Sequence, residues 1–235
     1  MLSIVCPFYN EKENLPILVE RIGKVVAGLQ ESWEVVFVDD GSTDGGPETM
    51  ATLIAHQPGF RLLRLDRNYG LTTALYAGLR AAQGDVLATL DADLQNPPEE
   101  ITKLLAFLKE ADIVTGVRAK RQDTWLKKIS SKIANTVRRA VTKDHIQDIA
   151  CTLRVFKRET LEAFYPYNGM HRFFLAIAER QGFKIKQVPV THAPRLYGKA
   201  KYGVLNRIVG PLSDLCVVRW MFAKQIRYRF KEGTV

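Results

Sequence analysis

The 235-residue chain contains three cysteines, four histidines and no long uninterrupted apolar run. The cysteines are far apart and lack the paired spacing of a zinc site, so the sequence predicts a reducing compartment. Residues 1–5 have the pattern of a strand and lack the basic region and long apolar core of a secretory signal. The most apolar stretch, residues 204–223, is interrupted by Arg207, Asp214 and Arg219. We therefore expect no segment to span a bilayer.

Two further absences exclude classes of enzyme. No Gly-x-Gly-x-x-Gly motif follows the first expected strand, which argues against a dinucleotide-dependent oxidoreductase. No two histidines have the spacing of a metal site. The four histidines are each expected to be structural or solvated: His56, His145, His171 and His192.

The net charge of +9 is distributed unevenly along the chain. Residues 1–117 hold 9 basic and 17 acidic side chains, whereas residues 118–143 and 195–231 each hold 9 basic and one acidic. This division suggests a metal-using half joined to a surface for an anionic partner. Composition does not choose between nucleic acid and an anionic membrane. A nucleic-acid-binding protein is the remote alternative, because it would leave the acidic strand ends without a purpose.

Short apolar runs alternate with amphipathic stretches through residues 1–117, the pattern of βα units around a mostly parallel sheet. Strands are expected at Ser3–Pro7, Glu34–Asp39, Arg61–Leu65, Val86–Leu90 and Ile113–Val117. Helices are expected at Leu15–Leu29, Gly46–His56, Leu71–Ala82 and Pro98–Glu110. Beyond residue 118 we expect helices at Trp125–Thr142, Glu159–Phe164 and His171–Gln181, and strands at Cys151–Phe156 and Lys184–Val190.

Residues 205–230 form a basic amphipathic region that is expected to be helical and broken near Gly210 and Pro211. Its aromatic residues, such as Trp220 and Phe222, alternate with arginines and lysines. This pattern is typical of a helix at a membrane surface, where rings lie at headgroup depth and cations meet lipid phosphates. The alternative is an ordinary packing helix with one solvated face.

The most informative residues are Asp91 and Asp93, which follow the apolar run Val86–Leu90, with Gln95 close behind. Ligands bind at the carboxyl edge of open α/β sheets. Carboxylate and amide oxygens suit a hard divalent cation that keeps positions open for water and a substrate phosphate. The simpler alternative is a solvated Asp-x-Asp turn. A second acidic pair at another strand end favours the metal site.

Three other polar clusters follow expected strands, at residues 7–11, 38–45 and 67–70. All four clusters should meet along one edge of the sheet. There the Asp40 carboxylate suits a hydrogen bond to a base or ribose hydroxyl, and Tyr9 offers a ring for stacking.

In combination, these clusters resemble glycosyltransferase family 2, the inverting enzymes with the GT-A nucleotide-sugar fold. The matching motifs are Pro-x-Tyr-Asn-Glu at residues 7–11, Val-Asp-Asp-Gly-Ser-x-Asp at 38–44, Arg-Asn-x-Gly at 67–70 with Ala74 and Gly78, and Asp-Ala-Asp-Leu-Gln at 91–95. Within the family, the chain is most similar to polyprenyl-phosphate glycosyltransferases such as dolichol-phosphate mannose synthase. That similarity rests on Gly116-Val117-Arg118, on Asp148 with Cys151 and Arg154, and on residues 195–203.

The resemblance implies an α/β GT-A fold with a mostly parallel central sheet flanked by helices. Residues 1–203 would form the catalytic domain, with a nucleotide-sugar and metal half (1–117) and an acceptor half (118–203), and residues 204–235 a basic interfacial tail. The implied nucleotide-sugar site is Pro7, Tyr9, Glu11, Val38, Asp40, Asp91, Ala92, Asp93 and Gln95. The resemblance further implies Mg²⁺ or Mn²⁺ at Asp91, Asp93 and Gln95, acceptor phosphate at Arg118, Lys132, Arg195 and Lys201, and catalytic roles for Asp91, Asp93, Arg118 and Arg195.

Gln147 and Asp148 bear on the acceptor, because many family members that act on sugar hydroxyls carry a Glu-Asp pair there, with a carboxylate as base. An acceptor phosphate is already ionised near neutral pH and needs positive side chains more than a base. Two positions depart from the close relatives, since Lys132 replaces a frequent arginine and Ala200 a more usual serine.

We therefore expect a metal-dependent hexosyltransferase that moves a sugar from a nucleotide-diphosphate sugar to a polyprenyl (dolichyl or undecaprenyl) phosphate, with inversion. The alternative is a family 2 enzyme that acts on a carbohydrate or protein hydroxyl, with a base near Asp148. The expected location is peripheral, on the cytoplasmic face of the membrane, through the tail or through a partner protein that supplies an anchor. Nucleic acid is not an expected partner. The sugar, the base (uridine or guanosine), the prenyl length and the choice of metal stay open.

Overall fold

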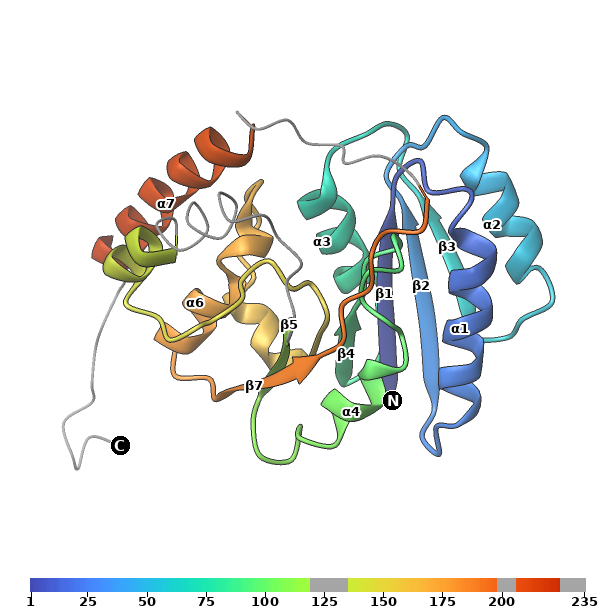
Figure 1. Ribbon diagram of the computed structural model, residues 1–235, viewed down its shortest axis with the longest axis horizontal. Helices are drawn as coiled ribbons and strands as arrows, with labels where there is room; N and C mark the ends of the chain where they lie inside the picture. Colours follow the sequence, from blue (N-terminus) through green and yellow to red (C-terminus); the bar gives the residue numbers. More distant parts are fainter. Residues whose placement is uncertain (119–134, 198–205, 225–235) are drawn as a thin grey trace, which may run out of the picture.

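The computed structural model describes residues 1–118, 135–197 and 206–224. Within these residues, a seven-stranded sheet has the order β3-β2-β1-β4-β6-β5-β7 (Figure 1). The strands are β1 (Leu2–Phe8), β2 (Trp33–Asp39), β3 (Phe60–Arg64), β4 (Val86–Thr89), β5 (Ile113–Arg118), β6 (Arg154–Lys157) and β7 (Ile185–Val190). The α-helices are α1 (Leu15–Ala27), α2 (Gly46–Ile54), α3 (Leu71–Ala81), α4 (Glu100–Leu105), α6 (Phe174–Arg180) and α7 (Asn206–Lys224). Two short 3₁₀ helices are η1 (Arg158–Ala163) and η2 (Met170–Arg172).

The sheet is mostly parallel, with β6 as the exception. Strand β6 lies antiparallel between β4 and β5, while the other neighbours pair in parallel. The carboxyl ends of β1, β2, β4 and β5 therefore lie at one edge, and β6 begins at that same edge with Arg154. As a result, the loop that precedes β6 lies beside the loop that follows β4.

Successive side chains of the strands pack alternately into two hydrophobic cores, one on each face of the sheet. In β1, Ile4 and Cys6 belong to the core under α1, α2 and α4, whereas Val5 belongs to the core under α3, α6 and α7 (Figure 1). A Cβ on Gly78 of α3 would lie 2.5 Å from Val5 Cγ1 and 2.7 Å from Val38 Cγ2. Glycine at this position lets α3 lie directly on the sheet, and the start of α3 thereby reaches the carboxyl edge.

The expected fold is confirmed in class and in most strand positions. However, β6 begins at Arg154 and not at Cys151, and four helical segments differ from expectation. Helix α4 is shorter than the expected Pro98–Glu110, because residues 106–110 continue as tighter turns such as Phe107 N–H to Leu104 O. The expected helix Glu159–Phe164 is the 3₁₀ helix η1, and His171–Gln181 divides into η2 and α6.

The tail helix is the fourth difference. Helix α7 runs without interruption from Asn206 to Lys224, so the expected break near Gly210 and Pro211 is wrong. A proline removes one backbone donor, which a helix tolerates when its next turns are packed. Here Leu215, Val218 and Phe222 are buried in the core shared with α3 and α6. Of the expected helix Trp125–Thr142, residues 135–142 are described and are helical; the remainder lies outside the described residues.

Among residues 1–118, 135–197 and 206–224, no helix combines the length and apolar character needed to cross a bilayer.

Candidate active site

A pocket of about 350 Å³ lies at the carboxyl edge of the sheet. Six segments meet there: the loop after β1, the end of β2, the loop after β3, the start of α3, the loop after β4 and the segment after β7. The lining residues are Pro7, Phe8, Tyr9, Glu11, Asp40, Asn68, Gly70, Leu71, Ala74, Asp91, Ala92, Asp93 and Arg195. Most residues that the sequence assigns to the nucleotide sugar are thus brought together, along with Arg195 from the acceptor set.

The two aspartates follow β4 within a tight turn. Leu90 N–H donates to Val5 O at 3.1 Å, which keeps the chain on the sheet up to Asp91. Leu94 then adopts a left-handed φ of +60° while its side chain is buried, and Gln95 N–H donates to Asp93 Oδ1 at 3.1 Å. This turn directs both carboxylates into the same pocket.

The electrostatics of the pair favour a cation. Burial, and secondarily the negative charge of Asp93, raise the pKa of Asp91 to about 6, although the hydroxyl of Thr152 lowers it. A positive ion between the carboxylates would relieve this repulsion. The donors are hard oxygens, which suit Mg²⁺ or Mn²⁺. The described residues contain no cluster of three or more histidine, cysteine or acidic ligands, so phosphate and water oxygens would complete the coordination.

Arg195 supplies positive charge beside Asp93. Its Nη2 lies 2.7 Å from Asp93 Oδ2. The segment after β7 is held in place by two hydrogen bonds, from Thr191 N–H to Glu100 Oε1 at 3.0 Å and from Ala193 N–H to Gln95 O at 2.8 Å. These two bonds hold Arg195 at the wall of the pocket.

Asp40 supports the wall of the pocket as well as lining it. Its buried carboxylate accepts hydrogen bonds from Asn68 Nδ2 at 3.1 Å, Tyr69 N–H at 2.8 Å and Gly70 N–H at 2.9 Å. Gly41 has a φ of +70°, and a Cβ there would lie 2.3 Å from the backbone carbon of Arg67. The close approach of these two loops therefore requires glycine and positions the Arg-Asn-x-Gly segment over the pocket.

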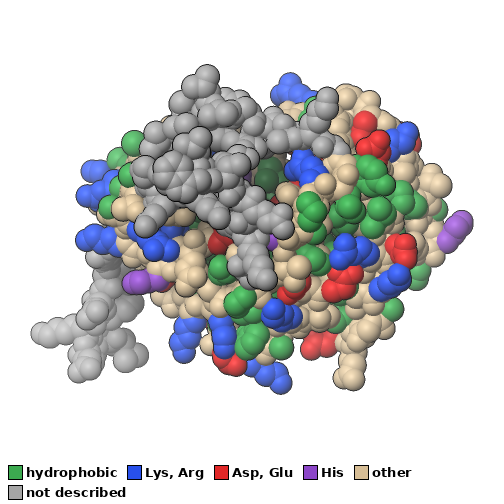
Figure 2. Space-filling view, viewed as in Figure 1, with side chains coloured by type: hydrophobic (Ala, Val, Ile, Leu, Met, Phe, Trp, Pro, Cys, Tyr) green, Lys and Arg blue, Asp and Glu red, His purple; other side chains and the backbone are tan. Residues whose placement is uncertain are grey.

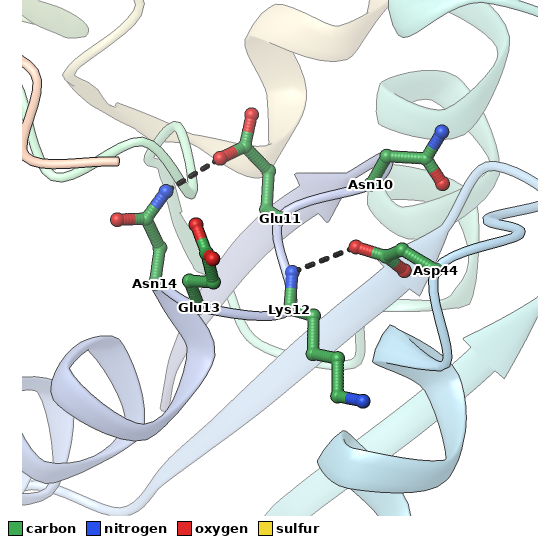
Figure 3. A pocket seen from close by; sticks show the side chains of 6 residues that line it. All are labelled: Asn10, Glu11, Lys12, Glu13, Asn14 and Asp44. Carbon is green, nitrogen blue, oxygen red and sulfur yellow. Dashed lines mark hydrogen bonds between the residues drawn. The ribbon is translucent and has the colours of Figure 1, made fainter. Parts of the chain in front are cut away.

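Glu11 lies between this pocket and a second polar hollow of about 350 Å³ (Figure 3). The hollow is lined by Asn10, Glu11, Lys12, Glu13, Asn14 and Asp44. Asn14 Nδ2 donates to Glu11 Oε2 at 2.5 Å, and Lys12 N–H donates to Asp44 Oδ2 at 2.9 Å (Figure 3). These bonds fix the loop after β1 and hold the Glu11 carboxylate in place.

The remaining predicted residues lie elsewhere. Val38 is fully buried in the core, and neither Val38 nor the Gln95 side chain belongs to the pocket wall. Arg118 lies at the end of β5, where its Nε and Nη2 donate to the two oxygens of Asp148 at 2.7 and 2.8 Å. Lys132 and Lys201 are outside the described residues.

Two side chains that support the site were not assigned to it from the sequence: Thr152 and Arg154 in its buried position. Thr152 Oγ1 donates to Asp91 Oδ2 at 2.5 Å. Arg154 is 3% exposed and donates to His171 O and Ile149 O, both at 3.1 Å, so a positive charge is buried behind the aspartates. The sequence signal was the spacing from Asp148 to Arg154, which marks this segment without indicating which side chain meets Asp91.

His171 has a structural role, as the sequence analysis expected. Its Nδ1 lies 2.6 Å from Thr72 Oγ1, which also accepts a hydrogen bond from Gly169 N–H at 2.9 Å. Burial, together with the positive charges of Arg172 and Arg154, lowers the pKa of His171 to about 3. The neutral imidazole thus joins η2 to the first turn of α3.

Comparison with known proteins identifies the family. The family model for glycosyl transferase family 2 matches residues 3–164. An undecaprenyl-phosphate 4-deoxy-4-formamido-L-arabinose transferase of Serratia proteamaculans is 39% identical over 91% of this chain and 66% of its own length. A protein of the same name from Aeromonas hydrophila is 37% identical over 88% of this chain and 64% of its own length. The chain therefore spans slightly less than two thirds of these relatives.

Solved structures share the fold. Glucosyl-3-phosphoglycerate synthase from Mycobacterium tuberculosis, solved with Mn²⁺, UDP and glucosyl-3-phosphoglycerate, aligns over 97% of this chain and 81% of its own, with a TM-score of 0.71 and 19% identity. A mannosyltransferase from Pyrobaculum calidifontis, solved with GDP-Man and Mn²⁺, aligns over 97% of this chain and 65% of its own, with a TM-score of 0.64 and 21% identity. The expected GT-A architecture is confirmed. The motifs at the strand ends, the fold and the matched residues together establish that this chain belongs to glycosyl transferase family 2.

Proposed function

We propose that this chain transfers a sugar from a nucleotide-diphosphate sugar to a polyprenyl phosphate. The observation that carries the proposal is the pair Asp91 and Asp93 facing Arg195 in one pocket. Carboxylates that hold a divalent cation suit the donor diphosphate, and a guanidinium beside them suits the acceptor phosphate. The names of the curated relatives support a polyprenyl phosphate as the acceptor.

The donor would occupy the pocket of about 350 Å³, whose size suits a small ligand. Pro7, Tyr9 and Glu11 would face the nucleoside from one side, and Asp40 with Asn68 from the other. A divalent cation at Asp91 and Asp93 would offset the charge that gathers on the diphosphate as the sugar leaves. Arg195 would bind the acceptor phosphate beside that diphosphate and offset the repulsion between the two groups.

Asp148 distinguishes the two classes of acceptor. A sugar or protein hydroxyl needs a general base, whereas a phosphate is already ionised. In this chain both carboxylate oxygens of Asp148 accept hydrogen bonds from Arg118, and Oδ1 also accepts one from Ala150 N–H at 3.2 Å. A carboxylate committed to an arginine is a poor base, which supports phosphate. One direct displacement at the sugar would invert its configuration and give a β-linked lipid from an α-linked donor.

A polyprenyl acceptor lies in a membrane, and the outer face of α7 supports a peripheral location. Trp220 is 63% exposed, Val217 is exposed, and Arg219 and Lys224 are exposed beside them. Figure 2 shows lysine and arginine side chains gathered at the left edge of the molecule, where Figure 1 places the C-terminal end of α7. Amphipathic surfaces of this kind bind anionic lipid headgroups. A partner protein that supplies an anchor is the alternative.

The test is a product assay. The protein is incubated with Mn²⁺ or Mg²⁺, a short-chain polyprenyl phosphate and a panel of UDP- and GDP-sugars that includes UDP-4-deoxy-4-formamido-L-arabinose. Mass spectrometry of the lipid fraction should detect one sugar phosphodiester, and EDTA should abolish it. Transfer to a carbohydrate or peptide acceptor without any lipid product would refute the proposal.

A further inference from the structure

We propose that Thr152 is a positioning residue for the metal carboxylate Asp91, acting through its hydroxyl. This inference rests on the proposed function, because it concerns the same acidic pair. Thr152 lies in the loop before β6, and 61 residues separate it from Asp91 in the sequence. The antiparallel insertion of β6 beside β4 brings the two together.

The direction of the hydrogen bond follows from the groups around the hydroxyl. Thr152 Oγ1 lies 2.5 Å from Asp91 Oδ2, a distance typical of a hydroxyl that donates to a carboxylate. On its other side the hydroxyl faces Asn96 Nδ2 at 3.5 Å, and this amide group can only donate. The single hydroxyl proton of Thr152 is therefore directed at Asp91.

The threonine is itself held firmly. Its carbonyl oxygen accepts a hydrogen bond from Thr89 Oγ1 at 2.6 Å, and Thr89 is the last residue of β4. In the sheet, Thr89 pairs with Arg154, two residues after Thr152. The backbone of Thr152 is thus bonded to the end of β4, the strand that Asp91 follows. This anchoring lets the Thr152 hydroxyl fix the side-chain torsions of Asp91.

Each carboxylate of the acidic pair has its own hydrogen-bond partner. Thr152 binds Oδ2 of Asp91, and Arg195 binds Oδ2 of Asp93. Gln95 N–H also donates to Oδ1 of Asp93, so the orientation of each carboxylate is fixed by its hydrogen bonds. A ligand that is held in advance loses less conformational entropy when a cation binds, and loss of such outer partners typically costs about 10- to 100-fold in metal affinity.

The experiment measures Mn²⁺ binding directly. Electron paramagnetic resonance of free Mn²⁺ is recorded as Mn²⁺ is titrated into protein with UDP, and separately with GDP. The variants are Thr152→Val, which keeps the shape but removes the hydroxyl, and Thr152→Ser, which keeps the hydroxyl. Thr115→Val is the matched control, because Thr115 is fully buried on the adjacent strand β5 and its hydroxyl makes no hydrogen bond. If Thr152→Val does not fold, Thr152→Ala takes its place.

We expect Thr152→Val to weaken Mn²⁺ binding about tenfold or more, and Thr152→Ser to stay within about threefold of the wild type. Thr115→Val should bind like the wild type. Wild-type affinity in Thr152→Val, or equal losses in the valine and serine variants, would overturn the inference while leaving the proposed function standing. If the wild-type protein fails to bind Mn²⁺ in the presence of UDP and also in the presence of GDP, the proposed function is overturned, and this inference with it.

Discussion

Arg195 contacts Asp93 across 102 residues of sequence, with 2.7 Å between Nη2 and Oδ2. This ion pair closes the candidate active site, because it joins the segment after β7 to the loop after β4. It also brings a residue assigned to the acceptor phosphate against a carboxylate assigned to the metal. In the proposed reaction, the acceptor phosphate and the cation would therefore bind next to each other.

Removing the Asp93 carboxylate tests the metal assignment. Asp93→Ala should weaken Mn²⁺-dependent nucleotide binding by about 100-fold while the protein stays folded, because the proposed metal ligand and its ion pair with Arg195 are both lost. Isothermal titration with UDP and with GDP, each with and without Mn²⁺, measures the effect. Asp66→Asn is the control, since Asp66 is exposed outside the pocket. Full metal-dependent binding in Asp93→Ala would reject the assignment.

Substitution of Arg195 separates acceptor use from donor activation. Arg195→Ala should lower kcat/KM for the polyprenyl phosphate by about 10- to 100-fold, with a smaller effect on slow hydrolysis of the donor. Arg195→Lys should recover part of the loss, because lysine keeps the charge but not the planar fork. Steady-state assays of both reactions provide the comparison. Equal losses in transfer and hydrolysis would count against a role toward the acceptor.

The Arg118–Asp148 pair is predicted to be structural. Asp148→Asn should destabilise the protein by about 3 kcal/mol, because the mostly buried guanidinium of Arg118 loses its charged partner. Urea denaturation measures the difference. Glu99→Gln breaks the more exposed Arg21–Glu99 pair and should cost less than about 1 kcal/mol. If Asp148→Asn is as stable as the wild type and binds lipid normally but does not turn over, Asp148 is a general base and the hydroxyl acceptor becomes the better reading.

His171 predicts how stability depends on pH. Its pKa is lowered to about 3 in the folded protein, mainly by burial, against an ordinary value of 6.5. Below pH 6.5, His171 binds a proton in the unfolded chain but stays neutral in the folded protein. The free energy of unfolding therefore falls as the pH drops from 6.5 toward 3. The slope from this group is at most about 1.4 kcal/mol per pH unit. Urea titrations at pH 7.5, 6 and 5 should show it, and His171→Gln should flatten it; an unchanged slope in the variant would assign the effect to other groups.

The outer face of α7 and the residues after it should mediate binding to anionic membranes. Trp220→Ala, and separately removal of residues 224–235, should weaken co-sedimentation with vesicles that contain phosphatidylglycerol. Each cation removed is expected to cost about fivefold, since a basic side chain near an anionic surface contributes about 1 kcal/mol. Vesicles of phosphatidylcholine alone are the control. Unchanged sedimentation of both variants would favour a partner protein as the anchor.

Local pattern was sufficient for much of this fold. Strands β1 to β5 were predicted within about two residues, because each is an apolar run bounded by turn residues. The pocket residues at the ends of β1, β2 and β4 were also predicted, since parallel strands present their carboxyl ends at one edge. The tight turns after α4 and the continuous α7 were missed, because tertiary burial outweighs the local helix signal near Leu108 and the helix-breaking signal of Gly210 and Pro211.

The sequence by itself determined the class of the fold, the family and the acidic pair Asp91 and Asp93, because these depend on short motifs and on the period of apolar residues. Only the tertiary structure decided which side chains meet that pair. Arg195 reaches Asp93 and Thr152 reaches Asp91 because β6 runs antiparallel between β4 and β5, and because the segment after β7 is bonded to the loop that follows β4. Strand order is a property of the whole sheet, and no local pattern of residues encodes it.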